Sequence, residues 1–116
     1  MTRAVLFEDA AGRITGVSVK GHSGYAEEGS DIVCAGISTL LITIDQALCS
    51  LVGLSPIERG GEDGFAEVLL PPGISGKQME QAQLLFGALR IGFSTIAEQY
   101  PAYFRLTTRK VHEPRP

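Results

Sequence analysis

The chain has 116 residues, of which 44% are hydrophobic and 20% charged, so length and composition predict one globular domain over residues 1–116 and exclude a disordered or fibrous chain. The net charge of −3 gives no reason to expect a basic surface, so we expect no direct nucleic-acid binding. No apolar run approaches the ~20 residues that span a bilayer, and the amino-terminal stretch lacks the apolar run of a secretory signal, so we expect a cytoplasmic protein outside the membrane.

The first predicted elements form a β-hairpin. Residues 2–8 (TRAVLFE) and 13–20 (RITGVSVK) are rich in β-branched and apolar side chains, and the turn signal DAAG lies between them. Residues 21–30 follow as a glycine-spaced loop. The hairpin therefore leads directly into a loop that is free of regular periodicity.

A long helix is predicted next. From Asp31 to Gly53, apolar residues recur at helical spacing. Ser30 is a suitable N-cap, and Gly53 is a suitable C-terminal stop. Because the apolar positions cover much of the circumference, we expect this helix to be buried on more than one side, either centrally or against a second subunit.

A second hairpin and a second helix follow. The stretches SPIER (55–59) and FAEVLLP (65–71) flank GGEDG, another turn signal. Ser75 and Gln78 make a capping box, and the helix that they begin carries a core-facing apolar stripe as far as Pro101, which stops it.

The last element completes the predicted fold class. Residues 102–108 (AYFRLTT) alternate like a strand, with Phe104 and Leu106 on one face. The predicted order is β-β-α-β-β-α-β, an α+β domain in which two helices pack on an antiparallel or mixed sheet of about five strands.

One histidine and one cysteine are candidates for catalysis. Cys34 falls in the first turn of the predicted helix, where unpaired N–H groups and the helix dipole favour a thiolate and can hold an oxyanion. His22 follows a strand, and the loop after it can bring it beside Cys34 as its base. Asp31 is the best-placed residue to orient the imidazole, ahead of Glu27 and Glu28, or it serves only as an anion at the helix start.

The other residues of this region have two interpretations each. Ser38 lies one turn beyond Cys34, and either bonds the backbone or lines the site. A cysteine at such a position is commonly a small buried hydrophobe, and we expect Cys49 in the core. In a cytoplasmic protein both thiols stay reduced. No metal-binding spacing is present, so we predict neither metal nor cofactor. The glycines of the loop either form turns or let a lid move: Gly21, Gly24 and Gly29.

The stretch GHSGYAEEGSDIVCAGIS, residues 21–38, closely resembles the motif of the ribosomal-processing cysteine protease family, Prp. The matching features are a Gly-His pair followed by a small residue, a glycine-containing loop, the run Asp-aliphatic-Val-Cys-Ala, and a serine four residues past the cysteine. The length and the layout of the rest of the chain also fit that family's short α+β domain. Ser23 stands where alanine is also common in the family, which leaves the mechanism intact.

The resemblance implies a cysteine endopeptidase that removes the amino-terminal extension of a large-subunit ribosomal protein and so supports ribosome maturation. It implies that Cys34 is the nucleophile and His22 the general base and acid, while Asp31 and Ser38 match motif positions in or near the site. It also implies a homodimer, a loop that gates the site, and an apolar groove for the peptide.

Two other classes of function stay open at this point. A non-catalytic module that binds the ribosome or a ribosomal protein would merely bury Cys34. In a redox-sensing thiol protein, peroxide would oxidise Cys34 rapidly, and the protein would cleave no peptide.

Overall fold

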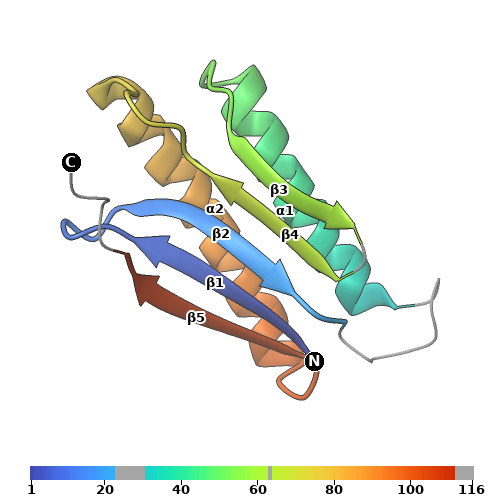
Figure 1. Ribbon diagram of the computed structural model, residues 1–116. Helices are drawn as coiled ribbons and strands as arrows, with labels where there is room; N and C mark the ends of the chain where they lie inside the picture. Colours follow the sequence, from blue (N-terminus) through green and yellow to red (C-terminus); the bar gives the residue numbers. More distant parts are fainter. Residues whose placement is uncertain (23–30, 63, 112–116) are drawn as a thin grey trace.

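The computed structural model describes residues 1–22, 31–62 and 64–111. In these residues a five-stranded sheet, in the order β3-β4-β2-β1-β5, carries two helices on one of its sides (Figure 1). The prediction of an α+β domain with the order β-β-α-β-β-α-β is confirmed. The elements are β1 (Thr2–Glu8), β2 (Ile14–Lys20), α1 (Ile32–Ser50), β3 (Ile57–Glu62), β4 (Phe65–Leu69), α2 (Gly76–Gln99) and β5 (Phe104–Lys110).

The sheet is mixed. Strand β2 pairs antiparallel with both β1 and β4, β3 pairs antiparallel with β4, and β1 pairs in parallel with β5. Strand β3 continues to Glu62, into the predicted turn, because Gly60 takes a φ of +76° beside a register shift. Strand β5 begins two residues later than predicted, since residues 101–103 form a turn, and Phe104 and Leu106 do share the core side of the sheet.

Helix α1 begins one position later than its predicted cap. Asp31, with φ −79° and ψ 96°, is the N-cap, whereas the predicted cap, Ser30, lies outside the described residues. The helix ends at Ser50, and Gly53, with φ +76°, donates its N–H to the carbonyl of Cys49 (3.2 Å). The expectation of a buried Cys49 is wrong: the adjacent Leu48 occupies the core position, and neighbouring residues of a helix point about 100° apart.

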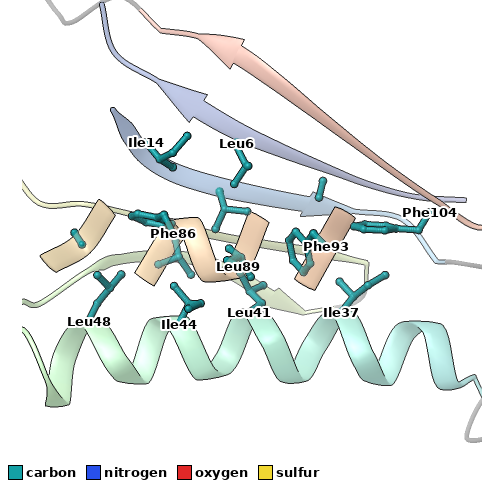
Figure 2. Close-up of a cluster of buried hydrophobic side chains, with 14 of the residues drawn as sticks. Leu6, Ile14, Ile37, Leu41, Ile44, Leu48, Phe86, Leu89, Phe93 and Phe104 are labelled. Atoms are coloured by element: carbon teal, nitrogen blue, oxygen red, sulfur yellow. The ribbon is translucent and has the colours of Figure 1, made fainter. Parts of the chain in front are cut away.

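Helix α1 is longer and more apolar than we expected when we found no run near the length that spans a bilayer. With 19 residues and a mean hydropathy of 1.8, it is long and apolar enough to cross a membrane by length and composition alone. That is weak evidence, because core helices pass the same test, and the inner side of α1 is built into the core of this fold. Figure 2 shows Ile37, Leu41, Ile44 and Leu48 pointing from α1 toward the sheet and α2.

Helix α2 supplies the centre of the core. The capping box of Ser75 and Gln78 is present, as predicted. Phe86, Leu89 and Phe93 are fully buried from solvent between α1 and the sheet (Figure 2). The ring of Phe93 meets that of Phe104 edge to face, with centroids 5.3 Å apart. Each fully buried side chain of this size stabilises the fold by about 1.5–3 kcal/mol, so the core fixes where α1 lies against the sheet.

Candidate active site

His22 and Cys34 line the same cavity. The cavity has a volume of about 320 Å³ and lies between the first half of α1 and the sheet, at the end where β2 finishes. Both residues that the sequence singled out for catalysis are therefore brought to one site, although the loop that joins them, residues 23–30, lies outside the described residues. Gly24, Gly29, Glu27 and Glu28 belong to that loop.

The position of His22 depends on two glycines. Gly21 has a φ of +89°, and its N–H donates to the carbonyl of Gly64 (2.8 Å). A Cβ on Gly21 would lie 2.6 Å from the carbonyl oxygen of Met1, so only glycine fits. A Cβ on Gly64, where φ is +75°, would lie 3.3 Å from Nε2 of His22. The exposed imidazole thus lies against the backbone of the turn between β3 and β4.

Cys34 lies in the first turn of α1 and is half-buried. The Oδ1 atom of Asp31 accepts hydrogen bonds from the N–H groups of Val33 and Cys34, both at 3.0 Å. The N–H of Ala35 donates to the backbone carbonyl of Asp31 at 3.1 Å. Asp31 is therefore the helix cap. These three N–H groups bond Asp31 in this structure, and the expectation that backbone N–H groups of this turn hold an oxyanion stays a prediction.

The cavity has an apolar floor. Val19 and Ala66 come from the sheet, and Ile37, Leu41 and Ile42 come from α1. This matches the apolar groove expected for an apolar peptide. Ser38, which is exposed, also lines the cavity, in agreement with the second of its two interpretations.

The β3–β4 turn is the part of the site that the motif did not reveal. Gly61, Gly64 and Phe65 line the cavity, yet they lie some forty residues from His22 in the sequence. The signal was present as the glycine-rich stretch GGEDG, which we interpreted only as a turn. Among the described residues, no group of three His, Cys, Asp or Glu side chains is placed to hold a metal ion.

Comparison with known proteins identifies the family. The profile described as "Cysteine protease Prp" matches residues 1–105. The chain belongs to the cysteine protease Prp family. The ribosomal processing cysteine protease Prp of Bacillus subtilis (strain 168) is 31% identical over 96 residues, which cover 82% of this chain and 86% of that protein.

Solved Prp structures have the same fold. A crystal structure of the essential ribosomal processing protease Prp from Staphylococcus aureus, with a covalently linked product peptide, superposes with a TM-score of 0.83 at 26% identity. The same protease with a substrate peptide gives 0.78 at 25% identity. Each comparison covers 94% of this chain and 100% of the other.

Membership of the Prp family decides the class of activity. The chain is a cysteine protease, a hydrolase of peptide bonds. A purely binding module with an inert cysteine and a redox-sensing thiol protein are both disfavoured by this assignment.

Proposed function

We propose that this chain is the endopeptidase that removes the amino-terminal extension of a large-subunit ribosomal protein. The observation that carries the proposal is the shared cavity of His22 and Cys34 in a chain of the Prp family. The names of the relatives, which describe ribosomal processing proteases, and the peptides bound to the S. aureus protease support a peptide substrate from a ribosomal protein.

In the proposed mechanism, Cys34 is the nucleophile and His22 its base. His22 takes the proton of the Cys34 thiol, and the thiolate attacks the scissile carbonyl carbon. His22 then gives the proton to the leaving amine, so the peptide bond breaks and a thioester remains on Cys34. Water hydrolyses the thioester, which releases the new carboxylate and restores the thiol. Asp31 fixes the start of α1 and with it the backbone of Cys34.

The walls of the cavity select the substrate in this proposal. The apolar side chains of Leu41 and Ile42 lie about two turns beyond Cys34 on α1, and Ala66 of β4 also lines the cavity. An extended peptide with apolar or aromatic side chains next to the cut would bury them there at about 25 cal/mol per Å². A charged side chain at that position would lose its hydration without a partner.

A cleavage assay tests this function. The purified protein is mixed with the extended ribosomal protein of the same organism under reducing conditions, and the products are read by mass spectrometry. We expect one new amino terminus, which Cys34→Ala and His22→Ala abolish. Cys49→Ala is the matched control, because this exposed thiol lies at the other end of α1 and should cleave as the parent does. An intact substrate, or equal cleavage by Cys34→Ala, contradicts the proposal.

The assembly and location of the protease are also proposals. The helix layer exposes large apolar side chains, with Leu51 at 73%, Leu84 at 78% and Ile91 at 71% exposure, and an unpartnered apolar surface of this kind commonly marks an interface. We propose a cytoplasmic homodimer of one protease domain, residues 1–116, that uses this layer. Light scattering at micromolar concentration should give twice the monomer mass of 12.4 kDa. A measured mass equal to that of the monomer would contradict the dimer proposal.

A further inference from the structure

The side of the sheet that faces away from the helices carries a group of positively charged side chains. Among the described residues both helices lie on the other side, with the core between them and the sheet (Figures 1 and 2). Along β1, Ala4 and Leu6 point into that core, so the alternating residues Arg3, Val5 and Phe7 point to the open side. The strand register then places the open-side residues of the other strands.

Three cations stand in one row across the open side. Arg3 on β1 is directly opposite Lys20 on β2 and directly opposite Arg105 on β5. All three residues are exposed. Neighbouring strands lie about 4.8 Å apart, so the row spans roughly 10 Å. Like charges directly opposite each other on paired strands destabilise a sheet, and the folded state gains nothing evident from this arrangement.

No ion pair between the side chains that the structure describes includes a member of this row. Within the described part of the chain, the ion pair on this side joins Arg59 to Glu67, at 3.8 Å, one rung away. The ammonium of Lys20 lies 5.6 Å from the ring centroid of Phe65, which continues the row on β4.

The charge of the molecule is divided unevenly. The open side carries half of the ten lysines and arginines of the chain, while Glu67 is the acid among the described side chains there. Among the described side chains, the open side therefore carries five positive charges and one negative charge, although the net charge of the chain is −3. The net charge is an average over the whole chain, whereas nucleic-acid binding depends on the local electrostatic field. The cations of this side are Arg3, Lys20, Arg59, Arg105 and Arg109.

We propose that the open side of the sheet binds single-stranded RNA, with the row Lys20–Arg3–Arg105 on its phosphates. Evenly spaced cations suit a ligand with a repeating anionic backbone. Two half-buried aromatic rings, Phe65 and Phe7, lie on the same side and offer stacking surfaces for bases. An acidic protein segment would use the cations but not the rings, so the observations favour RNA. The row of cations lies on the opposite side of the sheet from the cavity of His22 and Cys34, and Phe65, at the start of β4, borders both.

Fluorescence anisotropy with a labelled RNA strand of about 12 nucleotides tests the proposal. We expect binding at about 50 mM salt and a slope of log K against log salt near −2, since three phosphates contribute about −0.7 each. The variant Arg3→Gln/Lys20→Gln/Arg105→Gln should weaken binding at least ~10-fold and flatten the slope. The matched control, Lys77→Gln/Arg90→Gln/Lys110→Gln, removes three exposed positive charges elsewhere and should change affinity less than ~2-fold.

Each outcome decides the proposal. No binding by the parent at low salt, or an equal loss in both triple variants, overturns it. Equal affinity for a polyglutamate peptide overturns the assignment to RNA. Thermal unfolding of the row variant separates binding from folding: we expect an equal or higher midpoint, because mutual repulsion is removed. If the midpoint falls, the single variant Arg105→Gln on the edge strand must still weaken binding for the proposal to survive.

Discussion

Asp31 offers a sharp test of how the nucleophile is held in place. Its Oδ1 atom caps two N–H groups of α1, one of which belongs to Cys34, at 3.0 Å each. Loss of an N-cap side chain costs about 0.5–2 kcal/mol, and a cap with two such bonds at a half-buried helix start belongs in the upper half of that range. We expect Asp31→Ala to lower the free energy of unfolding by about 1–2 kcal/mol. For a domain of this size, that corresponds to a fall of roughly 4–12 °C in the midpoint.

The same position separates a capping role from a chemical one. Asparagine is as good an N-cap as aspartate, so Asp31→Asn should unfold within about 0.5 kcal/mol of the parent. It should also retain most of the cleavage that Asp31→Ala loses. Urea unfolding gives the stability of each variant, and kcat/KM on a peptide substrate gives the activity. If Asp31→Asn is stable but as inactive as Asp31→Ala, the carboxylate acts on the catalytic groups and the capping account is refuted.

Three further predictions concern the glycine before the histidine, the acid on α1 and the core. Gly21→Ala should lower the free energy of unfolding more than Gly12→Ala does. Both glycines have φ above +80°, but a Cβ at position 12 meets no atom within 4 Å, so Gly12→Ala should cost only the ~1–2 kcal/mol of a left-handed residue. Equal thermal midpoints for the two variants would contradict the backbone clash at Gly21. Burial, and then a hydrogen bond and repulsion from Glu58, raise the pKa of Asp45 to about 6 from its ordinary 3.8. The folded state thus keeps this proton to a higher pH than the unfolded state does, so stability should fall as pH rises between about 3.8 and 6 and then level off. Thermal melts at a series of pH values test this. The prediction is contradicted if stability depends on pH in Asp45→Asn as it does in the parent. Phe93→Ala should cost about 3–5 kcal/mol in urea unfolding, and a loss below about 1 kcal/mol would show that the core repacks.

The sequence predicted the elements well because local signals and the fold agree. Binary patterning, the capping box at Ser75 and the glycine turns each act over a few residues, and all of them persist in the structure. Contacts between residues far apart in the sequence were not predicted. The register shift at the start of β2 is accommodated by Gln83 of α2, whose side chain bonds both the N–H and the carbonyl of Ile14, at 2.7 and 2.8 Å. No short-range pattern could reveal this contact.

The site was predicted in its chemistry but not in its walls. The motif from Gly21 to Ser38 was sufficient to single out His22 and Cys34, because both lie within one short stretch of sequence. The surface against which His22 lies comes from Gly64, and its placement depends on how β3 and β4 join the sheet. The capping bonds of Asp31 became visible only in the geometry of its Oδ1 atom, and whether its carboxylate also orients His22 stays a prediction to be tested.

The parallel pairing of β1 with β5 has a consequence for the order of folding. The two strands lie about a hundred residues apart in the sequence, and the N–H of Thr2, a residue of the active-site cavity, donates to the carbonyl of Tyr103 (3.0 Å). Hairpins form quickly. Pairing of two distant strands is slower, because the entropic cost of closing the long chain between them arises before their contacts form. We therefore expect the docking of β5 to be a late event, and until it occurs one edge of β1 stays unpaired. The N–H of Thr2 gains its partner at Tyr103 with that step, so we expect this edge of the cavity to be fixed late in folding.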